Sequence, residues 1–145
     1  KGFYVPSLYD VEYNTDGTIK SFEPKYPDVP KRVEKRIIKD LNKSCFPTKP
    51  IMPFIEVVHD RIMLETFRGC IRGCRFCQAG MIYRPLRERD LEFLKDRASK
   101  MLKSTGHEEI SLSSLSSSDY SKLKELVYFL IDEFKDKFIL KTYSM

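Results

Sequence analysis

The segment that decides the reading of this chain is a short cysteine-rich stretch, residues 69–77, which runs Gly69-Cys70-Ile71-Arg72-Gly73-Cys74-Arg75-Phe76-Cys77. Its three cysteines follow a C-x3-C-x2-C pattern. Three thiolates can hold three irons of a cubane iron–sulfur cluster, and the fourth iron then has no protein ligand. Electron carriers of the ferredoxin type use four cysteines for each cluster and leave no such position. The spacing therefore favours a cluster that acts on a bound molecule over one that only stores electrons.

Two other interpretations of the cysteines stay open. A structural zinc site needs four ligands, and the fourth would have to be Cys45, His59 or His107. Cys74 and Cys77 also fit a C-x-x-C redox motif, although this leaves Cys70 without a role. We interpret Cys45 as an incidental small apolar residue, and the two histidines as surface or turn residues rather than catalytic bases.

The composition is that of an ordinary soluble domain. The 145 residues are 41% hydrophobic and 32% charged, enough for one domain or a small domain with an extension. No apolar run approaches the ~20 residues that span a bilayer, and no signal peptide is visible. We therefore expect a cytoplasmic protein with no membrane partner, in a compartment where clustered cysteines bind metal or do redox chemistry. The chain starts without methionine and stops inside an apparent strand, so we expect a piece of a longer protein.

The net charge of +5 is unevenly distributed. Between positions 68 and 89 there is one acid, Glu88, against six arginines: Arg68, Arg72, Arg75, Arg84, Arg87 and Arg89. Arginine favours bidentate contacts with carboxylate and phosphate, so RNA stays open as a partner. Arg84 and Arg87 could balance a negative cluster, bind an anionic substrate, or form structural ion pairs. A second basic run over 31–43 is interpreted as a solvated face.

The first third of the chain predicts a hairpin and a connector. Strands over 8–13 and 18–22 flank the turn dipeptide Asp16-Gly17. The next stretch is punctuated by prolines and reads as extended, including 33–41; its prolines are Pro24, Pro27, Pro30, Pro47, Pro50 and Pro53. We expect residues 1–53 to be a hairpin and linker that follow a missing N-terminal domain, and residues 54–145 to begin a second domain.

From residue 54 strands and helices alternate. The pattern predicts strands over 54–58 and 61–67, a helix over 91–103 between Asp90 and Gly106, and a strand over 109–113. A second helix, capped by Ser118 or Asp119, has its apolar face within 123–134, and Phe138 begins a further strand. Such alternation implies parallel strands with the chemistry in loops after their carboxyl ends. The cysteine loop and the serine run 116–118 should then lie at one end of the sheet.

The cysteine loop resembles that of the radical S-adenosylmethionine (SAM) superfamily, in which an aromatic residue such as Phe76 precedes the last cysteine. The stretches 68–80 and 113–120 resemble a group of uncharacterised bacterial proteins that carry a cobalamin-binding domain ahead of the radical SAM barrel. The resemblance implies an α/β fold, the N-terminal part of a partial TIM-type (β/α) barrel, preceded by a β-hairpin and an extended Pro-rich connector. A cobalamin domain would lie before Lys1.

The resemblance also implies an activity. A [4Fe–4S] cluster on Cys70, Cys74 and Cys77 would bind SAM at its vacant iron. One electron, from a low-potential donor of the flavodoxin or ferredoxin type, would cleave SAM to methionine and a 5′-deoxyadenosyl radical. Phe76 would pack near the adenine. The backbone of Ser116, Ser117 and Ser118 would contact the methionine ammonium. These serines replace the family's common Gly-Gly-Glu form, and Asp119 is a candidate carboxylate substitute.

The substrate is not readable from this sequence, because the later strands of such a barrel would supply most of its pocket. We expect the chain not to be active alone. Two alternatives remain open: a methylthiotransferase-like enzyme that modifies RNA, and a basic nucleic-acid-binding module with a structural metal.

Overall fold

The computed structural model describes residues 2–55, 57–135 and 139–142. The chain divides into two compact units, Lys1–Ile38 and Lys39–Met145. The sequence placed a boundary after Pro53, whereas this division comes earlier. The reason is that Leu41 is buried in the second unit, where its carbonyl oxygen accepts a hydrogen bond from Arg89 at 2.6 Å.

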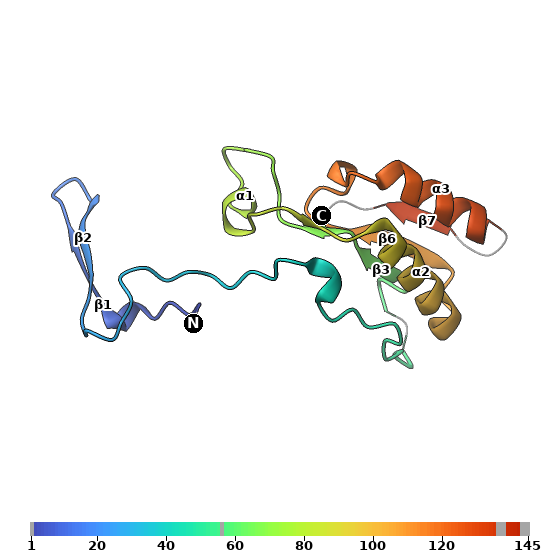
Figure 1. The fold of residues 1–145 in the computed structure, drawn as a ribbon, viewed down its shortest axis with the longest axis horizontal. Helices are drawn as coiled ribbons and strands as arrows, with labels where there is room; N and C mark the ends of the chain where they lie inside the picture. The colour runs from blue at the N-terminus through green and yellow to red at the C-terminus, as the bar shows by residue number, and fades with distance from the viewer. Residues whose placement is uncertain (1, 56, 136–138, 143–145) are drawn as a thin grey trace. The chain divides into compact units, whose positions relative to one another are not determined.

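The first unit is the predicted hairpin. Strands β1 (Tyr9–Tyr13) and β2 (Ile19–Pro24) pair antiparallel, after a short 3-10 turn η1 (Pro6–Leu8). They are the blue arrows of Figure 1. Gly17 has φ +82° in the connecting turn, a conformation that favours glycine. The hairpin prediction is confirmed.

The second unit is built on a parallel sheet. Its strands β3 (Ile62–Glu65), β6 (Glu109–Ser113) and β7 (Ile139–Thr142) lie in the order β3-β6-β7. Both neighbouring pairs are parallel, as predicted. Phe138, with which the last strand was predicted to begin, lies outside the described residues. Glu65 is in register with Ser113, so the carboxyl ends of β3 and β6 meet at one edge of the sheet.

Two helices, α2 (Leu91–Thr105) and α3 (Leu123–Phe134), pack against this sheet. Figure 1 shows both helices beside the sheet. The helix predicted over 91–103 is confirmed, and Gly106 ends it with φ +74°. Full burial of one leucine or isoleucine side chain contributes about 1.5–3 kcal/mol, so the core residues dominate the stability of this unit. The buried core comprises Ile62, Leu64, Phe67, Leu94, Ala98, Met101, Leu102, Ile110, Leu112, Tyr120, Leu126 and Leu130.

Shorter elements surround the sheet's carboxyl edge. Strand β4 (Phe67–Arg68) continues from β3 after Thr66 and pairs antiparallel with β5 (Arg87–Glu88). Between them lie the cysteine loop and a one-turn helix, α1 (Ala79–Ile82). Two 3-10 turns complete the unit, η2 (Leu41–Lys43) and η3 (Ser117–Asp119). The sequence patterns predicted neither α1 nor β5.

Two local predictions are wrong. The strand expected over 54–58 is not formed at its described residues, where Phe54 and Val58 are fully exposed and no neighbouring strand is paired with them. The second helix does not begin after Ser118 or Asp119 but at Leu123, because Ser117–Asp119 form the separate turn η3. Asp90 does occupy the N-cap position of α2, although its side chain makes no capping hydrogen bond. Among the helices of the described residues, none has the length and apolar character needed to cross a membrane.

Candidate functional site

The cysteine loop leaves the sheet through a tightly packed glycine. Gly69 has φ +101°, and a Cβ there would lie 2.6 Å from the carbonyl oxygen of Pro85 and 2.8 Å from that of Tyr83. Both the conformation and the space therefore require glycine at this position. The start of the loop is fixed against the turn that precedes β5.

A second glycine fixes the far side of the loop. A Cβ on Gly80, in α1, would lie 2.8 Å from the carbonyl oxygen of Arg72. The short helix thus packs directly on the backbone of the loop. The residues between these two glycines carry all three clustered cysteines.

The three cysteines are free thiols with different exposure. Cys70 is buried, Cys77 is half-buried and Cys74 is exposed. One backbone hydrogen bond, from Cys77 N to the oxygen of Cys74 at 3.1 Å, closes a turn between the last two. Within the described part of the chain, no three His, Cys, Asp or Glu side chains are gathered closely enough to hold a metal ion. The thiol groups are thus not in a ligating arrangement here.

The donor set nevertheless fits an iron–sulfur cluster in its chemistry. Thiolates are the ligands of such clusters, and three of them stand within eight residues of one loop. Residues 69–78 contain neither helix nor strand, so no regular element has to be broken to gather the sulfur atoms. Within the described residues, neither Cys45 nor His59 nor His107 joins the three cysteines in a group that could hold a zinc ion.

The cysteine loop and the serine segment are joined directly. Arg72, between the first two cysteines, donates from Nε to Oδ2 of Asp119 at 2.8 Å and from Nη2 to Oδ1. The Asp119 side chain is 10% exposed and that of Arg72 is 62% exposed. The prediction that both motifs lie at one end of the sheet is therefore confirmed. Asp119 is not an unengaged carboxylate but half of an ion pair.

This pairing determines the charge of Asp119. The hydrogen bonds from Arg72, and next from Ser116, lower the pKa of Asp119 from 3.8 to about 2. The pKa of Arg72 is raised in return, mainly by its hydrogen bond to Asp119, with smaller Coulombic contributions from Asp119, Cys70 and Cys74. Both groups are ionised at neutral pH. The arginine charge also lies within electrostatic reach of two of the three cysteines.

The remaining residues expected to bind SAM are placed as follows. Ser117 is buried, and its hydroxyl lies 3.0 Å from that of Ser114. Ser118 is exposed, and the oxygen of Ser116 accepts a hydrogen bond from the backbone N–H of Asp119 at 2.9 Å. Phe76 is 94% exposed, so no part of the described chain covers its ring.

A buried arginine supports this edge of the sheet from behind. Arg89 is 1% exposed and donates to Glu65 Oε2 at 2.6 Å, to Ser44 Oγ at 3.0 Å and to the oxygen of Leu41. Burial alone would raise the pKa of Glu65, but hydrogen bonds from Arg68 and Arg89 outweigh it and lower that pKa. The last residue of β3 is therefore a carboxylate held between two arginines.

The serine segment is tied to β5 as well. Tyr120 is buried, and its hydroxyl donates to the oxygen of Arg89 at 2.8 Å. Burial, together with nearby acids, raises the pKa of Tyr120 to about 12, so it stays protonated and can donate. The backbone N–H of Ser121 donates to Glu88 Oε1 at 2.9 Å, and its hydroxyl donates to the other carboxylate oxygen.

Most arginines of the basic stretch are thus engaged within the chain. Arg68 pairs with Glu65, and Arg87 donates to the oxygens of Pro85 at 3.0 Å and Tyr83 at 3.4 Å. Arg72 and Arg89 have the partners given above, and Arg84 also interacts within the chain. Arg75 is exposed and has no hydrogen bond or ion pair with the described residues. The arginine run therefore offers little uncommitted positive charge for a nucleic acid.

One cavity lies at the edge of the sheet that carries the cysteine loop. It has a volume of about 290 Å³, and it is bounded by the ends of β3 and β6 and by the start of the loop. Its lining residues are Glu65, Phe67, Arg68, Gly69, Tyr83, Arg87, Ser113, Ser114 and Leu115. A cavity at the carboxyl ends of parallel strands is where ligands bind in folds of this kind.

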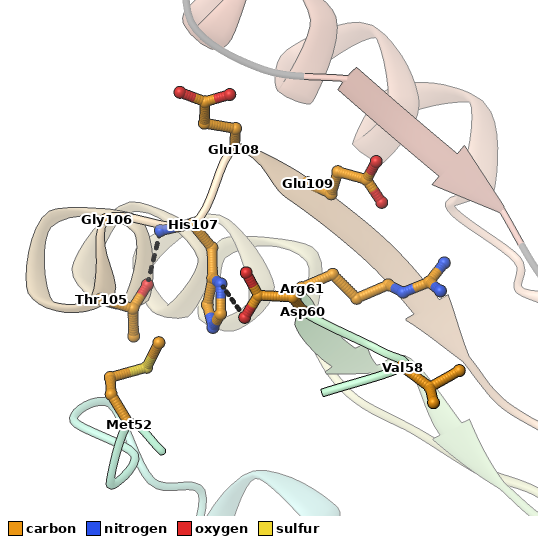
Figure 2. Close-up of a pocket in the computed structure, with 9 residues that line it drawn as sticks. All are labelled: Met52, Val58, Asp60, Arg61, Thr105, Gly106, His107, Glu108 and Glu109. Carbon is orange, nitrogen blue, oxygen red and sulfur yellow. Dashed lines mark hydrogen bonds and ion pairs between the residues drawn. The ribbon is translucent and has the colours of Figure 1, made fainter. Parts of the chain in front are cut away.

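A larger hollow, of about 570 Å³, lies beside the amino ends of β3 and β6. Figure 2 shows His107 next to Asp60 in the lining of this hollow, and the distance from Nδ1 to Oδ1 is 3.4 Å. This pair is at the opposite end of the strands from the cysteines. The interpretation of His107 as a loop residue is consistent with this position, after the end of α2.

The sequence patterns missed several residues that build the site: Glu65, Gly69, Arg72, Glu88 and Arg89. Gly69 and Arg72 were part of the quoted motif, but Gly69 was given no role and Arg72 was noted only for its charge. Arg89 stands between two acids in the sequence, Glu88 and Asp90, so nothing in its neighbourhood pointed to Glu65 as its partner. Its burial follows from the fold alone.

Comparison with known proteins agrees with this geometry. Residues 64–142, just over half of the chain, match the Radical SAM superfamily. An uncharacterized protein of Methanocaldococcus jannaschii is 41% identical over 70 residues, which are 48% of this chain and 16% of that protein. The chain thus matches about one sixth of the length of that relative. No solved structure matches the chain.

Proposed function

This chain belongs to the radical SAM superfamily, and on that premise we propose that it is the cluster-bearing part of an enzyme that cleaves SAM reductively. Membership implies, in general, a [4Fe–4S] cluster, SAM and an electron donor. The cluster, when bound, supplies the electron that cleaves the sulfonium C–S bond of SAM. The residues of this chain bind and orient the two cofactors.

The observation that carries the proposal is the bidentate Arg72–Asp119 pair. It joins the loop with the three thiols to the segment expected to hold the methionine part of SAM. The two segments are far apart in sequence, and in a parallel sheet only the carboxyl edge brings them together. A partial (β/α) barrel with its chemistry at that edge is the architecture we propose.

The roles assigned to single residues follow from their positions. Cys70, Cys74 and Cys77 are the proposed iron ligands. Phe76 presents an exposed ring that an adenine can cover. The backbone of residues 116–118 offers polar groups to the methionine ammonium, while Asp119 is occupied by Arg72.

Finer assignments are also proposals. The motif stretches 68–80 and 113–120 support the group that carries a cobalamin-binding domain ahead of the barrel. Residues 1–53 would then be the hairpin and linker that follow that domain. A donor of the flavodoxin or ferredoxin type is the proposed electron source.

Anaerobic reconstitution with iron and sulfide tests the ligand assignment. We expect about four irons and four sulfides per wild-type chain. Single alanine variants of Cys70, Cys74 and Cys77 should lose the cluster. The matched control is Cys45→Ala, an exposed cysteine outside the loop, which should keep it. A Cys74→Ala variant that still binds three or four irons would contradict the assignment.

A further inference from the structure

The Arg72–Asp119 pair connects two segments to which we assign different parts of the site. It is the ion pair that connects the proposed iron ligands with the proposed SAM contacts, because Arg72 lies between two of the cysteines and Asp119 directly follows the serine run. Two parallel hydrogen bonds fix the plane of the guanidinium as well as its distance. The position of one loop is thereby set by the other.

Other contacts hold the two ends of this connection in place. Gly80 of α1 packs on the backbone of Arg72. On the other side, Glu88 and the carbonyl of Arg89 hold Ser121 and Tyr120, which follow Asp119. Each partner of the ion pair therefore has further contacts beside it, which restrict how far its backbone can move.

The pair also balances charge beside the cysteines. Arginine carries one positive charge and ionised aspartate one negative charge, so the pair as a whole is neutral. Loss of one partner leaves a full charge close to the cysteine loop. A nearby negative charge opposes the addition of an electron, whereas a nearby positive charge favours it.

We propose that Arg72 and Asp119 form a positioning clamp, which holds the iron ligands and the SAM contacts at one spacing and neutralises the charge next to the cluster. The clamp rests on the proposed function. In this role the two residues position the groups that bind the cofactors and do not touch the reacting atoms.

The test is a charge cycle on the anaerobically reconstituted protein. Its variants are Arg72→Gln, Asp119→Asn and the exchanged pair Arg72→Asp with Asp119→Arg. The control is Arg75→Gln, which removes the same charge from the same loop where the described structure gives it no partner. Three quantities are measured: iron and sulfide per chain, affinity for SAM, and the reduction potential of the cluster.

The clamp predicts that each single variant weakens SAM binding at least tenfold, and that the exchanged pair recovers most of the loss. The reduction potential should fall in Arg72→Gln and rise in Asp119→Asn, because the residual charges have opposite signs. A merely structural role would not give shifts of opposite sign. Arg75→Gln should bind SAM as the wild type does.

The clamp is overturned if both single variants bind SAM like Arg75→Gln, or if both shift the potential in the same direction. Should the single variants hold no cluster at all, recovery of iron in the exchanged pair supports the clamp and continued loss overturns it. Failure of the proposed function gives a different result: the wild type itself would take up no cluster or bind no SAM, and the clamp would fall with it.

Discussion

Arg89 and Glu65 form an ion pair at the end of the first parallel strand, with 2.6 Å between Nη2 of the fully buried arginine and Oε2 of the carboxylate, whose side chain is 30% exposed. The guanidinium carbon of this arginine lies over the rings of Phe46 and Phe93, 4.9 and 5.2 Å from their centroids. Its other hydrogen bonds reach Leu41 and Ser44. One side chain thus attaches the segment around Leu41 to the strand that leads into the cysteine loop.

Replacement of Arg89 by methionine should strongly destabilise the second unit. Removal of the arginine takes the hydrogen-bond donor from the buried oxygen of Leu41, while Glu65 keeps its ion pair with Arg68, so we expect a cost of about 1–3 kcal/mol. The matched control is Arg68→Met, because Arg68 pairs with the same carboxylate but its side chain is 42% exposed. Exposed pairs contribute about 0–1 kcal/mol. Urea unfolding measures both; equal losses in the two variants would show that Arg89 has no special role.

Gly69→Ala should disturb the base of the cysteine loop. The new Cβ would meet two carbonyl oxygens, and φ of +101° is strained for any residue other than glycine. We expect the free energy of unfolding to fall by about 1–3 kcal/mol. Gly73→Ala in the same loop is the control, because a Cβ there meets nothing within 4 Å. An unchanged unfolding midpoint in Gly69→Ala would contradict the packing described for this loop.

Two nearby phenylalanines should behave in opposite ways. Phe67 is 2% exposed in the core, and its replacement by alanine should cost about 3–5 kcal/mol of unfolding free energy. Phe76→Ala should change that free energy by less than about 0.5 kcal/mol, because its ring is exposed. If Phe76 covers the adenine, its variant should still bind SAM more weakly. Calorimetric SAM titration of the reconstituted Phe76→Ala protein checks this, and wild-type affinity would remove Phe76 from the site.

The lowered pKa of Asp119 predicts a pH dependence for the cluster-free protein. Its folded pKa of about 2 lies below the ordinary value of 3.8, so its stabilising effect is present above about pH 4 and is lost as the pH falls toward 2. Asp119→Asn should therefore be less stable than the wild type near neutral pH, and the difference should shrink on acidification. Unfolding midpoints of both proteins across this range measure the effect. A difference that does not change with pH would argue against an ionised pair.

The sequence was sufficient to predict those elements that have a periodic hydrophobic pattern or a characteristic turn residue. The hairpin around Gly17, the helix before Gly106 and the parallel pairing of the strands could all be predicted, because each follows from turn residues, hydrophobic spacing or the alternation of strands and helices. The strand expected over 54–58 could not be judged in this way. Its apolar residues suit a strand, but a strand also needs a neighbour to pair with, and that is a property of the fold.

The candidate site was predicted only in part, because some of its contacts join residues that are far apart in the sequence. The cysteines and the serine run are recognisable in the sequence. The predicted alternation of strands and helices placed both at one edge of the sheet. Asp119 was expected to face a ligand, and only the structure shows that Arg72 already holds it. Long-range ion pairs such as this one, and the Arg89–Glu65 pair, leave no periodic signal in a single sequence.

The most direct test of the central claim is electron paramagnetic resonance of the reduced, anaerobically reconstituted protein, recorded with and without SAM. An open iron on a three-cysteine cluster predicts a reduced four-iron signal that changes when SAM is added. Bound zinc without sulfide, or a four-iron signal that SAM leaves unchanged, would contradict the account.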